Sequence, residues 1–363
     1  MRILQVDSGR EWRGGQNQVR LLVRELARAP QPGVELLLAT KRGSELARRA
    51  TADGVTVAGL PWTLGLDPRA AWWLRRLVTH WRPDVIHVHD SHALSLARWA
   101  RAWRRQPPRL LAHRRVDFHV RKGSGWHRAD AIVAVSEGVK RVLTDDGVPA
   151  ARITVIPDGI DADEVRQSAT RPLDIRARLR LPPGTPLAVN VAALVDHKDQ
   201  GTLLRAAHAA RADAPDLHWA IAGDGELRRS LEAEVARLEL HDRVHLLGYL
   251  EEADALIREG DVFVMSSKEE GLGSVVLHAL ALEKPVVATA AGGLPEVVPA
   301  EWLVPVGDAE ALAGKVVAAL NRSSPVPFPP QFTARAMAES VLALYRSLPR
   351  LQGRDLRLRA GSQ

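Results

Sequence analysis

The side chains of this sequence that could do chemistry gather around one carboxylate, Glu270, which stands in a glycine-bearing turn. The apolar run before it, Val262–Met265, is typical of a buried parallel strand, and the amphipathic stretch after it predicts a helix over 274–282. A second apolar run, Val286–Thr289, leads into another glycine turn. The sequence therefore predicts a strand–helix–strand unit whose two turns lie at the carboxyl ends of parallel strands, where open α/β sheets bind ligands.

These turns combine two kinds of binding group. Glycine turns and helix N-termini present backbone N–H groups to anions such as phosphate. The Glu270 carboxylate accepts hydrogen bonds and therefore suits hydroxyl groups. A ligand that carries phosphate together with many hydroxyls needs both kinds of group, and a sugar nucleotide is such a ligand.

The same stretch resembles the donor-site signature of the retaining family 4 glycosyltransferases (glycosyl transferases group 1). Two positions depart from the pattern, because His278 stands where a second acidic residue belongs and Glu283 stands where glycine is usual. The resemblance implies an α/β fold with two Rossmann-like domains facing each other across a cleft, the GT-B fold. The matching positions are Glu270, Gly271, Gly273, Lys284, Pro285, Thr289, Gly292, Gly293 and Glu296.

The resemblance also implies which residues hold the donor, a nucleotide-diphosphate sugar for which a UDP-sugar is the first expectation. Catalytic roles are expected for Lys198, which would neutralise the diphosphate, and for Glu270, which would bind sugar hydroxyls. The family's second cation is missing, since Ala193 occupies its position, and Arg13 or Arg114 could substitute for it. The expected donor-binding residues are Gly14, Gly15, Gly223, Gly225, Gly248, Tyr249, Ser267, Gly271, Leu272, Gly273 and His278.

His278 is the clearest departure from the family pattern. A carboxylate at this position accepts hydrogen bonds from two ribose hydroxyls, whereas a neutral imidazole has a single acceptor nitrogen. Two interpretations stay open. Either His278 contacts the ribose through one hydrogen bond, or it is turned into the core of its domain.

On the acceptor side, the family places a residue close to the reacting carbon in the loop that follows the strand at 110–112. Asp117 and His119 are the candidates here, with Asp117 preferred, and both are expected to be catalytic. The alternative is that Asp117 forms an ion pair with Arg114 and has no role in the reaction.

Histidines after the strand at 85–88 raise the question of a metal. His87 and His89 alternate on one face of that strand, and Asp90 follows without a clear third ligand pattern. A structural or substrate-binding role is therefore preferred for the histidines. No metal and no other cofactor is expected, and Lys, Arg and backbone groups would neutralise the phosphates.

The length of 363 residues predicts two domains, and a hydrophobic content of 46% allows each a full core. We expect an acceptor domain over 1–166, a proline-bearing linker over 167–183 and a donor domain over 184–332. By resemblance, a helix over 333–348 returns to the first domain, and a basic tail follows over 349–363. Cysteine is absent, which excludes disulfides and thiolate chemistry.

Charge is unevenly distributed along the chain. Residues 1–168 hold 28 Lys and Arg against 18 Asp and Glu, a balance of +10 within a total of +7. Trp at helical spacing is usually part of a core, but exposed Trp beside Arg, as at Arg98-Trp99, can also sit at a membrane interface. Arginine abundance could also reflect the base composition of the genome. Since the basic residues form no recognised nucleic-acid motif, nucleic acid is not an expected partner.

These observations together predict a metal-independent, retaining, hexosyltransferase-like enzyme. It would move a sugar to a glycan or lipid-linked acceptor in cell-envelope polysaccharide or lipopolysaccharide synthesis. Because the sequence contains no run of eighteen apolar residues and no signal peptide, the expected location is the cytoplasm or the inner face of its membrane. Two alternatives stay open: a sugar-nucleotide epimerase on the same fold, and a non-catalytic nucleotide-sugar binding module.

Overall fold

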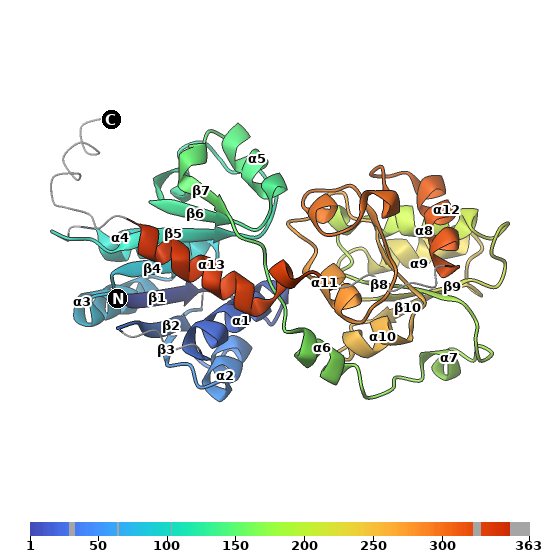
Figure 1. The fold of residues 1–363 in the computed structure, drawn as a ribbon, viewed down its shortest axis with the longest axis horizontal. Coiled ribbons are helices and arrows are strands. Elements are labelled where there is room, and N and C mark those ends of the chain that lie inside the picture. Colours follow the sequence, from blue (N-terminus) through green and yellow to red (C-terminus); the bar gives the residue numbers. More distant parts are fainter. Residues whose placement is uncertain (29–32, 64, 103, 322–327, 349–363) are drawn as a thin grey trace. The chain divides into compact units, whose positions relative to one another are not determined.

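The computed structural model describes residues 1–28, 33–63, 65–102, 104–321 and 328–348 (Figure 1). The chain divides into two compact units. Unit 1 contains Met1–Gly159 and Ala334–Gln363, and unit 2 contains Ile160–Thr333. The predicted basic tail over 349–363 lies outside the described residues. None of the described helices is long and apolar enough to cross a bilayer.

Unit 1 is built on a seven-stranded parallel sheet in the order β3-β2-β1-β4-β5-β6-β7. Because the strands are covered by helices, they read as short apolar runs rather than as alternating patterns. Its strands are β1 (Arg2–Asp7), β2 (Glu35–Lys41), β3 (Val57–Leu60), β4 (Val85–Val88), β5 (Arg109–Arg114), β6 (Ala131–Ala134) and β7 (Ile153–Val155).

The helices of unit 1 begin where polar side chains cap them. Ser44, Asp67 and Asp90 each accept hydrogen bonds from backbone N–H groups in the first turn of the helix that follows, which satisfies donors that have no partner within the helix. The helices are α1 (Gly14–Arg28), α2 (Glu45–Ala52), α3 (Pro68–Trp81), α4 (Ser91–Arg101), η1 (Gly125–Arg128), α5 (Glu137–Asp145), η2 (Ala150–Arg152) and α13 (Ala334–Ser347).

Unit 2 has a six-stranded parallel sheet in the order β10-β9-β8-β11-β12-β13. Its strands are β8 (Leu187–Val191), β9 (His218–Ala222), β10 (Val244–Gly248), β11 (Val262–Met265), β12 (Val286–Thr289) and β13 (Leu303–Val304). Its helices are α6 (Ala162–Ser168), α7 (Ile175–Arg178), η3 (Asp196–Lys198), α8 (Gln200–Ala209), α9 (Arg228–Arg237), α10 (Ala253–Glu259), α11 (Ser274–Ala281), η4 (Leu294–Glu296), η5 (Ala300–Trp302), α12 (Ala309–Leu320) and η6 (Pro330–Phe332).

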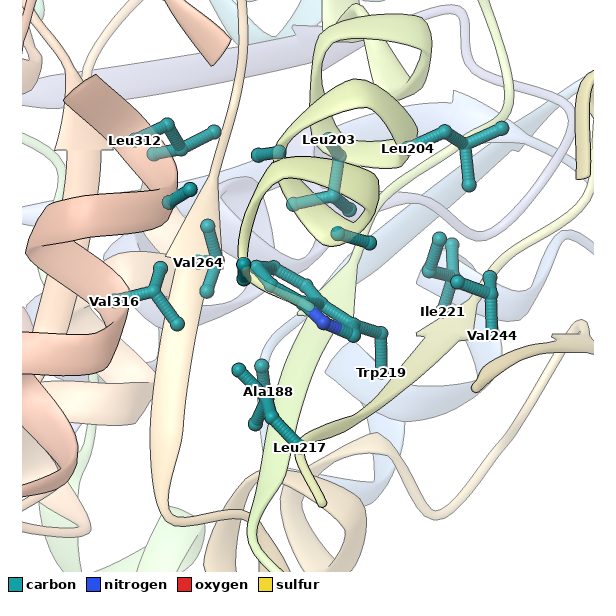
Figure 2. Packing of buried hydrophobic residues seen from close by; sticks show 14 of the residues in the cluster. Ala188, Leu203, Leu204, Leu217, Trp219, Ile221, Val244, Val264, Leu312 and Val316 are labelled. Atoms are coloured by element: carbon teal, nitrogen blue, oxygen red, sulfur yellow. The ribbon is translucent and has the colours of Figure 1, made fainter. Parts of the chain in front are cut away.

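The core of unit 2 is centred on Trp219 of β9 (Figure 2). Its indole lies among aliphatic side chains from α8 and from neighbouring strands, and α12 closes the cluster with Leu312 and Val316. Trp219 is 2% exposed, so this one side chain removes a large apolar area from water. The sheet that carries the functional loops of unit 2 is therefore anchored on a well-filled core.

The domain boundary differs from the one predicted from the sequence. Unit 1 ends at Gly159 instead of 166, and the expected linker over 167–183 is part of unit 2. Glu259 of α10 accepts hydrogen bonds from the backbone N–H groups of Leu173, Asp174 and Ile175. The prolines of this stretch suggested a free linker, but these long-range hydrogen bonds, to a residue over eighty positions away, are invisible in the sequence pattern.

Beneath α13, the sheet of unit 1 carries a buried polar network beside an apolar cluster that includes Met337 and Val341 of the helix. The hydroxyl of Tyr345 accepts from Gln5 Nε2 at 2.8 Å and lies 2.6 Å from His87 Nδ1. Gln5 Oε1 lies 2.8 Å from His89 Nε2. Since Tyr345 already accepts from Gln5, its own proton goes to His87 Nδ1, and the chain of hydrogen bonds ties α13 to two strands.

The guanidinium of Arg115 completes this network from the end of β5. It lies 3.1 Å from Nδ1 of His89 and 3.3 Å from Nδ1 of His113, and it is held at 2.9 Å by the Asp158 carboxylate. A guanidinium only donates, so both Nδ1 atoms accept and the neutral rings carry their proton on Nε2. Burial, followed by the charge of Arg115, lowers the pKa of His113 well below its usual range.

The buried histidines make the stability of unit 1 depend on pH. Burial lowers the pKa of His87 and His89 as well as that of His113, so they stay neutral when folded but take up protons when unfolded. Their contribution is intact above about pH 6.5 and is lost as the pH falls below it, by up to ~1.4 kcal/mol per pH unit for each histidine. Asp7 acts in the opposite sense below pH 6, because burial, followed by the charge of Asp90, raises its pKa to about 6.

We therefore expect the urea midpoint of unit 1 to fall between pH 7 and pH 5.5. Tryptophan fluorescence reports mainly on unit 1, because eight of the ten tryptophans belong to it and only Trp219 and Trp302 belong to unit 2. His113→Gln should flatten this pH dependence by about a third, since one of three such groups is removed. The exposed His92→Gln serves as the control. A slope that is equal in all three proteins would contradict the assignment.

Candidate active site

Lys198 and Glu270 form an ion pair inside unit 2, and both side chains are largely buried. Lys198 ends η3, just after β8, while Glu270 lies in the loop between β11 and α11. These two strands are parallel neighbours in the sheet, so their carboxyl ends lie at the same edge. The predicted catalytic pair of unit 2 is therefore brought together, although the two residues are 72 positions apart.

The loop between β11 and α11 is held by hydroxyl groups. Ser267 Oγ donates to the Glu270 carboxylate at 3.3 Å, and Thr289 Oγ1, at the end of β12, donates to the carbonyl of Ser267 at 2.6 Å. Ser266 Oγ donates to the carbonyl of Lys198 at 3.0 Å. Both serines are fully buried. These contacts connect the ends of three neighbouring strands and fix the position of the carboxylate.

Local backbone conformation and packing explain why glycine occupies position 273 in this loop. Gly273 lies immediately before the first residue of α11 with a φ of +83°, which L side chains rarely adopt. A Cβ there would lie 2.6 Å from Leu294 Cδ2. Gly271 and Leu272, which are also predicted to bind the donor, are both buried. The backbone N–H of Gly293 donates to the Glu270 carbonyl at 2.9 Å, which joins the two glycine turns.

Gly223 and Gly225 allow two loops of unit 2 to touch. A Cβ on Gly223, whose φ is +146°, would lie 1.8 Å from the Ala192 carbonyl oxygen. A Cβ on Gly225 would lie 2.4 Å from the Leu194 carbonyl oxygen. The close approach of the turn after β9 to the chain after β8 thus explains both glycines, and their contact with a donor stays a prediction.

At the end of β10, Gly248 has a φ of +75° and Tyr249 is 73% exposed. Arg228 Nη1 lies 3.2 Å from the place where a Gly248 Cβ would be. The sequence interpretation missed this cation, which is the first residue of α9 and also pairs with Glu232 at 3.0 Å. No motif marks Arg228 in the sequence, so only its place in the fold brings it to this turn.

His278 neither points into the core nor stands alone. Its Nδ1 lies 2.7 Å from Asp254 Oδ1, and Asp254 in turn accepts a hydrogen bond from Ser168. Burial raises the pKa of Asp254, but the hydrogen bond and charge of His278 more than offset this and lower it. The pair connects α11, α10 and α6, and neither Asp254 nor Ser168 was a candidate from the sequence.

In unit 1, Gly14 and Gly15 are the first two residues of α1, and both are exposed. A Cβ on Gly15 would meet nothing within 4 Å, so packing does not explain this glycine. The glycine is free to allow a ligand to approach the helix N-terminus, which keeps the donor-side prediction for this turn open.

The two acceptor-side candidates lie in the same loop of unit 1. His119 is strongly exposed, and its Nδ1 lies 2.8 Å from Asp146 Oδ1. Asp117 is half-buried, and its charge acts on Arg114. Arg114, which was offered as a substitute for the missing cation, is buried with its guanidinium 4.9 Å from the centroid of the Trp126 ring. The other proposed substitute, Arg13, is exposed and pairs with Glu11.

The structure adds a third histidine, His113, to His87 and His89, which the sequence left without a third partner. The signal was present in the sequence, because His113 lies near the end of β5, the strand beside β4. One nitrogen from each of the three rings lies within 4.8 Å of the others, but the Nδ1 atoms already have protein partners. Arg115 and Tyr345 occupy the Nδ1 atoms, and the His87 and His113 rings are nearly parallel, with centroids 5.3 Å apart. The cation within this cluster is the Arg115 guanidinium.

Comparison with known proteins gives the same assignment for both halves of the chain. Residues 12–164 match the model described as Glycosyltransferase Family 4, and residues 173–335 match Glycosyl transferases group 1. A GDP-mannose-dependent alpha-(1-6)-phosphatidylinositol monomannoside mannosyltransferase of Mycolicibacterium smegmatis is 30% identical over 71% of this chain and 72% of that protein.

Other relatives agree with this assignment. The amylovoran biosynthesis glycosyltransferase AmsK of Erwinia amylovora is 29% identical over 71% of this chain and 66% of its own length. Matches to three further curated relatives span only 40% to 48% of their lengths.

Among solved structures, Anabaena Alr3699/HepE in complex with UDP and glucose superposes with a TM-score of 0.78. The sequences are 19% identical, and the match covers 96% of this chain and 100% of the other. At this level of identity, the likeness concerns the fold alone, and it confirms the predicted α/β fold with two Rossmann-like domains, GT-B. On the strength of the two family matches and the Mycolicibacterium relative, the chain belongs to glycosyltransferase family 4.

Proposed function

We propose that this protein is a retaining, metal-independent glycosyltransferase that uses a nucleotide-diphosphate sugar, with a UDP-sugar as the first candidate. The observation that carries the proposal is the buried Lys198–Glu270 pair beside the glycine turns of the loop between β11 and α11. The fold likeness to a structure that contains UDP and glucose supports the choice of donor.

The pair suggests how a donor would be accommodated. Without a ligand, each charge compensates the other, which limits the cost of burying them. A diphosphate oxygen could replace the carboxylate as the partner of Lys198 and would release Glu270 to accept hydrogen bonds from sugar hydroxyls. Lys198 would then stabilise the negative charge that develops on the leaving diphosphate. This positive charge within the protein is the basis for the metal-independent proposal.

The acceptor is proposed to be a glycan or a lipid-linked sugar of a cell-envelope polysaccharide. By their names, the relatives from Erwinia and Mycolicibacterium act in amylovoran biosynthesis and on a phosphatidylinositol monomannoside. The sugar-nucleotide epimerase and the non-catalytic binding module remain the alternatives, and turnover distinguishes all three.

The first prediction tests the donor reaction with water as acceptor. UDP-α-D-glucose and related UDP-sugars should be cleaved slowly with EDTA present, and proton NMR should show the α anomer as the sugar first released. Lys198→Ala should slow UDP release by at least ~10²-fold, the scale for removing one transition-state charge stabiliser. Lys315→Ala, a half-buried cation on α12 of the same unit, is the matched control.

Different failures would remove different parts of the proposal. Loss of turnover in EDTA that Mn²⁺ restores would refute metal independence. A β anomer released first would refute retention. Binding of UDP without any cleavage would favour the non-catalytic module, and a changed sugar still joined to UDP would favour the epimerase.

The second prediction concerns His278, for which the ribose contact stays a proposal. Since Asp254 lies 2.7 Å from the ring, His278→Glu would place two carboxylates together. We expect it to lower the unfolding free energy of unit 2 by ~1 kcal/mol or more, whereas His278→Gln keeps a donor for Asp254 and should cost less. If the ribose contact exists, calorimetric titration of UDP should show weaker binding to His278→Ala by ~1 kcal/mol. Equal dissociation constants would rule that contact out.

The exposed face of α3 and α4 supports a peripheral contact with the cytoplasmic side of an anionic membrane. This surface is defined by Trp72, Trp73, Arg75, Arg76 and Trp99, and all of these except Trp73 line a hollow of about 500 Å³ together with Thr79 and His80. Its three tryptophans are each nearly half exposed, and the Arg75 and Arg76 guanidinium groups lie 5.2 Å and 5.1 Å from the Trp99 and Trp72 ring centroids. Neither helix contains an acidic residue. Indole and guanidinium together suit the interface between lipid headgroups and water.

The third prediction follows from this surface. The protein should co-sediment with phosphatidylglycerol vesicles at low salt and should be released as salt rises, because exposed charges are screened. The double variant Arg75→Glu, Arg76→Glu should lose this binding. The control is Arg171→Glu, Arg229→Glu, which reverses two exposed charges of unit 2. Equal binding of both variants would place the contact elsewhere, and no binding by the parent protein would favour a soluble acceptor.

A further inference from the structure

A second hollow of unit 1 lies at the carboxyl end of β5, separate from the α3–α4 surface. It has a volume of about 270 Å³ and is enclosed by α4, the start of η1 and the loop that carries His119. Its lining residues include Arg114 and Arg121 together with Ser91, Ser95 and Ser124. Without a ligand, Ser95 Oγ donates to the Ser91 carbonyl at 2.9 Å, and Ser124 Oγ lies 3.3 Å from His127 Nδ1. The size suits a small polar group and falls just below the usual range for complete drug-sized ligands.

Arg114 is the unusual member of this wall, because it is a cation that is only 8% exposed. Its Nη2 donates to the Phe118 carbonyl, and the guanidinium lies 4.9 Å from the Trp126 ring centroid. Its Nε–H finds no acceptor among the described residues. A buried donor without an acceptor costs free energy, and in a native protein it indicates either a structural reserve or an absent ligand.

The charges around Arg114 agree with this interpretation. Burial lowers the pKa of Arg114, and the carboxylates of Asp117 and Asp146 only partly offset this effect. Asp146 is itself engaged, since its two oxygens lie 2.8 Å from His119 Nδ1 and 2.6 Å from the Val120 N–H. The acids near the hollow therefore fix the loop, and an additional anion would improve the compensation of the arginine.

We propose that this hollow, the Arg114 pocket, binds a phosphate group of the acceptor. Guanidinium and hydroxyl donors around one small space are suited to the oxygens of phosphate. An uncharged sugar stacked on an aromatic ring is a poorer fit, because Trp126 is 5% exposed and Arg114 already covers it. The proposal rests on the proposed function where it assigns the phosphate to the acceptor, whereas binding of phosphate in the pocket can be tested without it.

The experiment is a calorimetric titration of inorganic phosphate into the full chain at constant ionic strength, with and without saturating UDP. UDP is included so that phosphate cannot bind in place of the donor diphosphate. With saturating UDP we expect one phosphate per chain, whereas without UDP a second phosphate can occupy the position of the donor diphosphate. Arg121→Ala and Ser95→Ala should each weaken binding by about tenfold, since each removes one hydrogen bond to a charged group, for which the Ser95 hydroxyl turns from the Ser91 carbonyl to the phosphate. Arg75→Ala, on the α3–α4 surface, should bind as the parent protein does.

Arg114→Lys completes the series, because it keeps the charge but removes the Nε–H and the planar fork. It should also weaken phosphate binding, and a thermal melt shows whether it has folded. Phosphate affinities that are unchanged in Arg121→Ala and Ser95→Ala would overturn the proposal, and so would complete loss of phosphate binding in UDP. Failure of UDP-sugar cleavage with phosphate binding intact would refute the proposed function and leave the pocket standing.

Titrations with two further ligands distinguish the possible sources of the phosphate group. Glycerol 3-phosphate represents a soluble phosphomonoester, and short-chain phosphatidylglycerol below its micelle concentration represents a lipid headgroup. If one of the two ligands binds more tightly, and Arg121→Ala weakens its binding about tenfold, the result supports the Arg114 pocket and identifies the source of the phosphate. Binding of neither ligand, when inorganic phosphate binds, would overturn the assignment of the pocket to an acceptor.

Discussion

The parallel pairing of β8, β11 and β12 is the constraint on which the candidate active site depends. It brings the ends of three strands to one edge of the sheet, where Lys198 meets Glu270 and Thr289 holds the carbonyl of Ser267. The core around Trp219 keeps these strands in place. A cation and a carboxylate can then remain close in a largely buried position, because each lowers the cost of burying the other.

Unit 1 also buries polar side chains, but it compensates them with a network of hydrogen bonds instead of a single ion pair. Its sheet carries histidines and a glutamine beneath α13, and most polar atoms of that layer have a partner in a chain of hydrogen bonds that runs from Tyr345 to Asp158. Such networks contribute to stability only when they are almost complete. The remaining exceptions among the described atoms include Nε2 of His87 and of His113 and, on the other face, Nε of Arg114. The last of these is the starting point for the phosphate pocket.

Much of this architecture could be predicted from the sequence, because strands, glycine turns and the Glu270 loop leave local patterns. The pairings across long distances could not. Nothing near His278 indicates Asp254, and nothing near 173–175 indicates the Glu259 carboxylate that makes an expected linker part of unit 2. His113 is an intermediate case, since knowing that β4 and β5 are neighbours would have placed it beside His89. Hydrogen bonds between distant elements depend on the fold, and a local pattern cannot contain them.

The chain leaves unit 1 after Gly159 and returns to it at Ala334, which affects how the two units can be produced separately. A fragment ending at Gly159 would lack α13. Gln5 and His87 would then lose the Tyr345 hydroxyl, and the apolar side chains that pack against α13 would be exposed to water. Ile160 and Thr333 are bridge partners, so the two points where the chain enters and leaves unit 2 are adjacent. Unit 2 is thus an insertion within unit 1. Joining residue 159 to residue 334 through a few glycines should therefore give a shorter protein that contains the whole of unit 1, with α13 in place.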